Sequence, residues 1–201
     1  GIIFQDCVNN TVTNNSITTH GTGNHSFGIF MAFLNLDSSP STELIVNNTI
    51  SIEAGNPSFG IGATESSNAK LLQLINNNYT RRITFGHPLY GMPAGGQIRD
   101  SSYVTISLRK INDLPVSGAT VRIASRNNAE ANPTSSLVLT TDNDGRVSPL
   151  LHNFLANATF STPDYINFNN YSVNISKSGF ADQNNIVLDA AKTMQLVVNM
   201  S

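Results

Sequence analysis

The chain has 201 residues, of which 12% are charged and 39% are hydrophobic, and its formal net charge is −2 at pH 7. A chain this close to neutrality, without a cluster of Lys and Arg, lacks the basic surface that nucleic-acid binding requires. The sequence contains no run of about eighteen apolar residues, so we expect no segment that spans a membrane directly. Its single cysteine excludes a disulfide within the chain.

A sequence pattern recurs through residues 1–92. The tetrapeptide Asn-Asn-Ser-Ile at residues 14–17 returns as Asn-Asn-Thr-Ile at residues 47–50, and an altered copy follows at residues 75–80. Gly-Ile steps recur with a similar spacing of about 30 residues, a period typical of solenoids, whose coils stack to bury their apolar faces. We therefore expect Ile and Phe to form ladders inside the stack, and Asn-Asn pairs to hydrogen-bond between coils at the corners.

Short strands separated by Asn, Gly and Ser corners are expected in this segment. Their bounds are Ile2–Val8, Thr11–Thr13, Ser16–Thr19, Gly28–Phe33, Glu43–Val46, Thr49–Glu53, Gly60–Ala63 and Lys70–Ile75. Residues 34–42 are predicted to form a loop that leaves the second coil. Prolines and glycines interrupt the repeat at residues 84–97, which predicts a cap or linker over about 81–100. Since the repeat is already in phase at Gly1, we expect a fragment with further coils upstream, or a neighbouring subunit that caps it.

From residue 101 the pattern changes to alternation of apolar and polar residues. Tyr103–Arg109 alternates strictly, as a half-buried strand does. Further strands are expected at Gly118–Ala124, Leu137–Thr140, Asn170–Ser176, Asn185–Leu188 and Thr193–Asn199. Regularly spaced strands of this kind predict an antiparallel β-sandwich over residues 101–201, so the whole chain is expected to be all-β.

Both segments resemble known families. The repeated Asn-Asn-Thr-Ile and Gly-Ile steps are similar to those of archaeal and bacterial surface proteins, which implies a right-handed parallel β-helix over residues 1–92. Pro115–Ile123, Thr141–Val147, Tyr171–Ile175 and Lys177–Phe180 resemble the carboxypeptidase-regulatory-like family, which implies a prealbumin- or Ig-like sandwich that acts as a spacer or docking module. This order of domains is similar to that of large archaeal cell-surface proteins, including surface-layer and filament components.

No set of residues predicts catalysis or a cofactor. Carbohydrate-cleaving β-helix enzymes need carboxylates clustered on one face, whereas the acidic residues of the first segment are scattered. Residues 142–145, Asp-Asn-Asp-Gly, begin like a calcium loop, but Leu151 stands where the glutamate ligand belongs. We interpret this stretch as a hairpin turn, with Asp142 and Asp144 kept as metal candidates.

Sequons of the form Asn-x-Ser/Thr are frequent along the chain. They predict glycosylation at Asn9, Asn14, Asn24, Asn47, Asn78, Asn157, Asn170, Asn174 and Asn199. The other explanation is that asparagine serves the backbone alone, because it tolerates the left-handed conformation at turns. The two explanations are compatible, since modified asparagines must also be exposed.

Together these features predict an extracellular, cell-surface glycoprotein that is a non-catalytic structural component of a surface layer, stalk or filament. The expected partners are further copies of the chain or neighbouring surface-protein subunits, and glycans. The alternative is an adhesin module that binds a carbohydrate or a host surface through a flat β-helix face or the 34–42 loop. A fragment of a polysaccharide-degrading β-helix enzyme is a third hypothesis.

Overall fold

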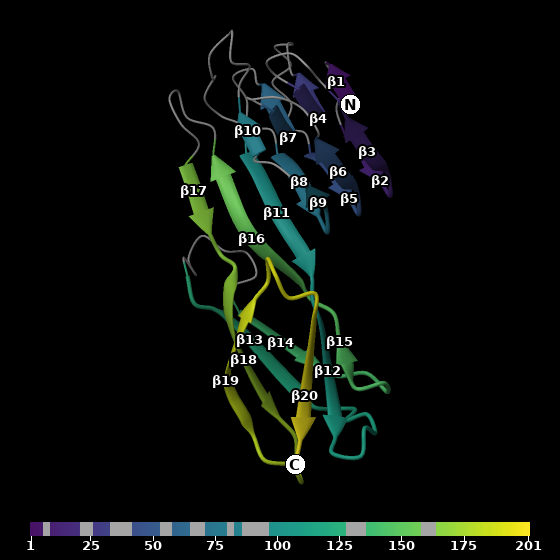
Figure 1. Ribbon diagram of the computed structural model, residues 1–201. Coiled ribbons are helices and arrows are strands. Elements are labelled where there is room, and N and C mark those ends of the chain that lie inside the picture. The colour runs from purple at the N-terminus through teal and green to yellow at the C-terminus, as the bar shows by residue number, and fades with distance from the viewer. Residues whose placement is uncertain are drawn as a thin grey trace. The chain divides into compact units, whose positions relative to one another are not determined.

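The computed structural model describes residues 1–5, 9–20, 26–32, 42–52, 58–64, 71–79, 83–85, 97–127, 136–157 and 164–201. Throughout these ranges the chain is all-β and contains no helix (Figure 1). The same ranges therefore offer no helix with the length and apolar character needed to cross a membrane. The chain divides into two compact units, Gly1–Asp100 with Ala156–Tyr165, and Ser101–Leu155 with Ile166–Ser201.

In the first unit, strands about 30 residues apart in sequence pair in parallel, as the repeat predicts. One sheet has the order β1-β4-β7-β10, with bounds Ile2–Gln5, Ser26–Ala32, Ser58–Thr64 and Ile83–Phe85. Another has the order β3-β6-β9, with bounds Ser16–Thr19, Thr49–Ile52 and Asn78–Tyr79.

A third parallel ladder joins β2, β5 and β8, with bounds Thr11–Thr13, Thr42–Val46 and Leu71–Ile75. These strands belong to a six-stranded sheet of order β17-β16-β11-β8-β5-β2. The remaining bounds are Gln97–Tyr103 for β11, Leu150–Asn157 for β16 and Asp164–Asn167 for β17.

The strand registers align isoleucines from successive repeats. Ile29 pairs in register with both Ile2 and Ile61, and Ile50 pairs with Ile17. Ile29, Ile50 and Ile61 are 0% exposed. The predicted alignment of isoleucines is therefore confirmed, and each buried side chain contributes roughly 25 cal/mol per Å² of apolar area removed from water.

Two predicted irregular stretches compare differently with the structure. The predicted 34–42 loop lies outside the described residues, apart from Thr42, which begins β5. Both β10 and the start of β11 fall inside the stretch for which a cap or linker was predicted, about 81–100. The prolines and glycines that suggested a linker all lie in residues 86–96, which are not among the described residues.

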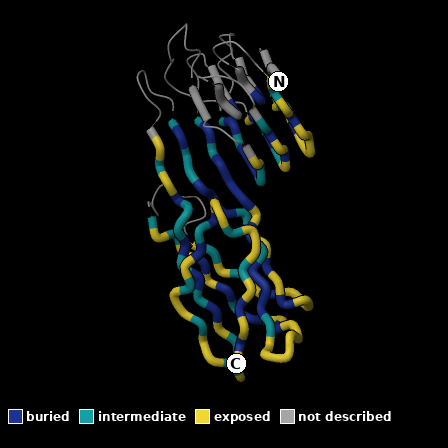
Figure 2. The backbone as a smooth tube through the Cα atoms, in the orientation of Figure 1, coloured by how far each residue is buried: buried dark blue, intermediate teal, exposed yellow. Residues whose placement is uncertain are grey.

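The second unit contains two further sheets. One has the order β15-β12-β20, with bounds Arg146–Val147, Thr105–Lys110 and Gln195–Met200. The other has the order β14-β13-β18-β19, with bounds Ser136–Thr140, Thr120–Ser125, Asn170–Ser176 and Gln183–Asp189. Buried positions alternate with exposed or half-buried positions along the central strands β13 and β18 (Figure 2).

This alternation creates one core from both sheets. Ile106 and Leu108 of β12 and Val121 of β13 are 0% exposed, and they belong to the same cluster of buried residues as Val173 and Tyr171 of β18. Long apolar side chains on one face of each sheet meet in this cluster, while the polar residues between them face away.

The prediction of purely antiparallel pairing in this unit is wrong at one pair of strands. Strand β12 pairs in parallel with β20, in a register that runs from Thr105↔Gln195 to Lys110↔Met200. Alternation along a strand fixes which face is buried, but it carries no information on the direction of the neighbouring strand. The sequence also did not predict that Ala156–Tyr165 would belong to the first unit.

Candidate functional site

Three corners between strands of the first unit share one backbone conformation. Asn14, Asn47 and Asn76 have positive φ angles of 57°, 55° and 52°. Asparagine adopts this left-handed conformation more readily than most residues, which explains its recurrence at a turn that must reverse direction within two residues. Each of these residues is followed by a second asparagine, whose side chain has a different role.

The second asparagines, Asn15, Asn48 and Asn77, form a hydrogen-bonded row across successive repeats. Asn15 Nδ2 donates to Asn48 Oδ1 at 3.1 Å, and Asn48 Nδ2 donates to Asn77 Oδ1 at 3.0 Å. The same oxygens accept the backbone N–H groups of Asn15 and Asn48, each at 2.9 Å. The predicted asparagine hydrogen bonding between repeats is thus confirmed, and we call these three residues the asparagine row.

Asn48 is the central member of the asparagine row and is 1% exposed. Its Nδ2 also lies 3.0 Å from the carbonyl oxygens of Val12 and Val46. All of its hydrogen-bonding groups therefore have partners within the protein, as a buried amide requires. The side chain joins three successive sequence repeats, because Val12 and Asn15 belong to the repeat before it and Asn77 to the repeat after it.

A second corner carries an incomplete version of the same arrangement. Asn9 also has a positive φ, of 58°, and the following residue, Asn10, donates its backbone N–H to Glu43 Oε2 at 2.6 Å. Glu43 is 1% exposed and pairs in register with Leu72, which offers no polar side chain. Among the described residues, Glu43 Oε1 and Asn10 Nδ2 have no hydrogen-bond partner, although both atoms are buried. A buried carboxylate with an unpaired oxygen destabilises the folded state, so this corner is less favourable than the asparagine row.

The predicted glycosylation sites fall into two groups by exposure. Asn9, Asn14, Asn47, Asn78 and Asn199 are exposed, whereas Asn157, Asn170 and Asn174 are half-buried. Asn24 lies outside the described residues. At the two repeated corners, the residue in the sequon is the outward asparagine and never a member of the asparagine row.

The predicted turn at residues 142–145 is present, but it is not a hairpin. Asp142 Oδ1 accepts the backbone N–H groups of Asp144 at 3.0 Å and Arg146 at 2.8 Å, which closes the turn. The strands on either side, β14 and β15, belong to different sheets, so the turn joins the two sheets. Gly145 has a φ of 72°, and a Cβ there would lie 2.6 Å from the carbonyl oxygen of Leu108, so only glycine fits.

The metal candidates Asp142 and Asp144 have no further acidic partner in the described ranges. No group of three or more His, Cys, Asp or Glu side chains comes together anywhere in those ranges. One oxygen of Asp142 is already occupied by the two N–H groups of the turn. Calcium takes six to eight oxygen ligands, so the two carboxylates do not make a calcium site by themselves.

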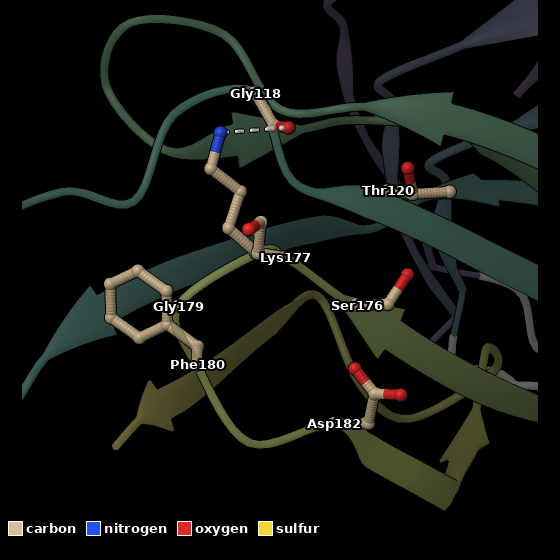
Figure 3. Close-up of a pocket in the computed structure, with 8 residues that line it drawn as sticks. Gly118, Thr120, Ser176, Lys177, Gly179, Phe180 and Asp182 are labelled. Atoms are coloured by element: carbon tan, nitrogen blue, oxygen red, sulfur yellow. Dashed lines mark hydrogen bonds between the residues drawn. The ribbon is translucent and has the colours of Figure 1, made fainter.

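An open depression of about 470 Å³ lies in the second unit. Its lining residues are Gly118, Thr120, Ser176, Lys177, Ser178, Gly179, Phe180 and Asp182. Figure 3 shows Lys177 reaching toward Gly118, where its Nζ donates to the carbonyl oxygen at 3.2 Å. An ammonium group has three donors, so two N–H groups remain available to water or to an anionic ligand.

Gly118 lies directly against the Lys177 ammonium. Its φ is 65°, and a Cβ at this residue would lie 3.0 Å from Lys177 Nζ. A larger side chain would therefore be strained and would displace the lysine. The depression offers one cation, hydroxyl groups, a carboxylate from Asp182 and the ring of Phe180, a set suited to a polar ligand with an apolar face.

Sequence reasoning missed a buried polar cluster in the second unit. Ser101 Oγ lies 2.7 Å from His152 Nδ1, and Asn153 Nδ2 donates to Ser102 Oγ at 3.0 Å. Tyr171 donates its hydroxyl to the backbone oxygen of His152 at 2.8 Å. Ser101 is 0% and His152 5% exposed, so both side chains of the pair are buried. The missed sign was the change from alternation to consecutive polar residues at positions 100–102 and 152–153.

No family model, curated protein or solved structure matches this chain.

Proposed function

We propose that this chain is a structural component of an extracellular surface assembly, such as a surface layer, stalk or filament, and that it is not an enzyme. The observation that carries this proposal is the asparagine row, in which Asn15, Asn48 and Asn77 link successive parallel strands through side chains and backbone together. Such a row fixes the position of each repeat on the next. Rigidity of this kind suits a load-bearing or spacing element.

The proposal includes a finer description of the first unit. We infer that its three parallel ladders are the faces of a right-handed parallel β-helix. Support comes from the common spacing of about 30 residues and from the corners at Asn14, Asn47 and Asn76, which share one conformation. A buried isoleucine row at Ile29 and Ile61 is what the interior of such a helix requires.

For the second unit we propose a prealbumin- or Ig-like sandwich that serves as a spacer or docking module. Support comes from two sheets that share one core, and from the resemblance of its turns to the carboxypeptidase-regulatory-like family. Strand β20 lies at the edge of its sheet and exposes Val197, 53% of which is accessible. An edge strand of six residues without charge or proline is suited to pairing with a strand from a neighbouring subunit.

Assembly is tested by electron microscopy and sedimentation of the purified chain over a range of concentrations. Ordered polymers or sheets are expected. Val197→Lys, which places a charge on the β20 edge, should reduce assembly. Val138→Lys changes a similarly exposed valine on β14, and it should leave assembly through β20 unchanged. A chain that stays monomeric at every concentration, together with binding to glycans on an array, would replace the structural proposal with the adhesin alternative.

The adhesin alternative has one specific observation in its favour, the depression at Lys177. A carbohydrate with an acidic group would place its carboxylate at the Lys177 ammonium and its hydroxyl groups near Thr120, Ser176 and Asp182. Lys177→Gln should abolish such binding and leave Ser101–His152 and the core unchanged.

The enzyme hypothesis is tested separately by turnover of polyuronates and neutral polysaccharides, for which no product is expected.

A further inference from the structure

The side chains of the corner asparagines divide into two chemical classes. Members of the asparagine row use Nδ2 as a donor to oxygens of the protein, as Asn48 does to Val12, Val46 and Asn77. These assignments are unambiguous, because the partners of Asn48 Oδ1 include a backbone N–H, which can only donate. The Nδ2 of such a residue is already hydrogen-bonded to oxygens of the protein, and the Asn48 side chain is buried.

The outward asparagines belong to the other class. Asn14 and Asn47 are exposed, have positive φ angles of 57° and 55°, and donate no side-chain hydrogen bond within the described ranges. Their Nδ2 groups are therefore free to react. In both tripeptides, Asn14-Asn15-Ser16 and Asn47-Asn48-Thr49, the third residue is also exposed.

The third repeat offers an acceptor at a neighbouring position. Asn78 is exposed and pairs in register with Thr49, so it lies beside the second corner. Its sequon is Asn-Tyr-Thr. Adjacent strands lie about 4.8 Å apart, so the three acceptors follow one edge of the first unit across three successive repeats.

We propose that Asn14, Asn47 and Asn78 form a row of N-linked glycans along this edge, while the asparagine row beneath them stays unmodified. The inference rests on the proposed extracellular location. In the reaction, the amide Nδ2 attacks the anomeric carbon of a sugar carried on a lipid phosphate or diphosphate donor. A C–N bond forms, the C–O bond to the phosphate breaks, the phosphate leaves with the electron pair, and Nδ2 loses one proton.

Because Oδ1 is retained in this reaction, a glycosylated asparagine can still accept a hydrogen bond through its carbonyl oxygen. It loses one of its two N–H groups and gains a bulky substituent. An outward asparagine tolerates both changes, because the structure uses neither N–H. Asn48 tolerates neither, since its Nδ2 lies 3.0 Å from three acceptor oxygens.

The consequence for assembly is that this edge faces solvent. A continuous line of sugars would exclude a neighbouring subunit, so contacts between copies are assigned to other surfaces. At both corners the sequon asparagine comes one residue before the asparagine that hydrogen-bonds between repeats. The first asparagine of each pair is therefore available at the surface, while the second stabilises the fold.

The test is expression of the full chain, with a secretion signal and a flexible tail carrying one control sequon, in a cell that performs N-glycosylation. Glycopeptide mass spectrometry should find sugar on Asn14, Asn47 and Asn78. Ser16→Ala should remove the modification from Asn14 alone, and Thr49→Ala should remove it from Asn47 alone, since both keep every asparagine. These substitutions fall at exposed positions, so the fold is retained.

The outcome that overturns the proposal is a chain in which Asn14, Asn47 and Asn78 carry no sugar although the control sequon is modified. The result is independent of whether the chain assembles. Polymers without sugar on Asn14, Asn47 and Asn78 would support the structural proposal and contradict the glycan proposal. A monomeric chain that carries sugar on these residues would support the glycan proposal and contradict the structural one.

Discussion

Removal of the Asn48 side chain is the sharpest test of the asparagine row. In Asn48→Ala, the backbone N–H of Asn15 loses its acceptor, and the buried donors to Val12 and Asn77 disappear. Each of these three lost bonds contributes about 1 kcal/mol net, since Asn15 is exposed and water can reach its N–H. The expected loss in the free energy of unfolding is therefore about 3 kcal/mol.

Asn15→Ala is the matched control, since it removes the same side chain from the exposed end of the row. It deletes bonds to Thr13 O and Asn48 Oδ1, but water can replace them because Asn15 is exposed. The expected loss is at most about 1 kcal/mol. Asn48→Asp should be worse than Asn48→Ala, because a second oxygen would face the oxygens of Val12, Val46 and Asn77.

The measurement is urea unfolding followed by circular dichroism, with hydrogen exchange of peptides from residues 42–52 to locate the effect in the first unit. A loss below about 1 kcal/mol for Asn48→Ala, or equal losses for Asn48→Ala and Asn15→Ala, would refute the reasoning, because water would then serve as well as the row.

Four further substitutions test other positions by the same urea unfolding. Gly145→Ala should cost more than about 2 kcal/mol, since backbone atoms lie 2.6 and 2.8 Å from the added Cβ, whereas Gly179→Ala should cost about 1 kcal/mol, since it meets only the strain of its φ of 85°. Similar losses of stability for Gly145→Ala and Gly179→Ala would contradict this reasoning. Thr141→Val should cost about 1–3 kcal/mol, because its hydroxyl pairs a buried backbone N–H and C=O. Glu43→Gln should stabilise the fold by about 1–2 kcal/mol, because a neutral amide costs less to bury than a carboxylate, and a loss would contradict this account.

Features encoded by a repeated spacing could be predicted from the sequence. The recurrence of Asn-Asn-Ser-Ile and Asn-Asn-Thr-Ile placed Ile17 and Ile50 in register and put Asn15 beside Asn48, as the structure has them. Alternation likewise predicted which residues of β18 are buried, with Tyr171 and Val173 inside. In both cases, the information lies in the spacing of side chains along one or two strands.

Features that depend on the choice of a distant partner could not be predicted. The parallel pairing of β12 with β20, and the division of β14 and β15 between two sheets, are decided by packing across the whole unit. The same holds for Glu43, which is buried at a place where the sequence pattern marks only the start of a strand. Its partner, the backbone N–H of Asn10, becomes visible only when successive repeats are aligned in space.

The asparagine row has a direction. Each side-chain amide donates toward the following repeat, from Asn15 to Asn48 and from Asn48 to Asn77, so the amide dipoles point the same way. Aligned amides polarise one another, and each added member strengthens the bonds already present. A longer stack would therefore gain more from its last repeat than a shorter one does. The two ends of such a stack would also differ chemically, because one presents an amide carbonyl oxygen and the other an amide N–H. A repeat added at either end would have to supply the complementary hydrogen-bonding group.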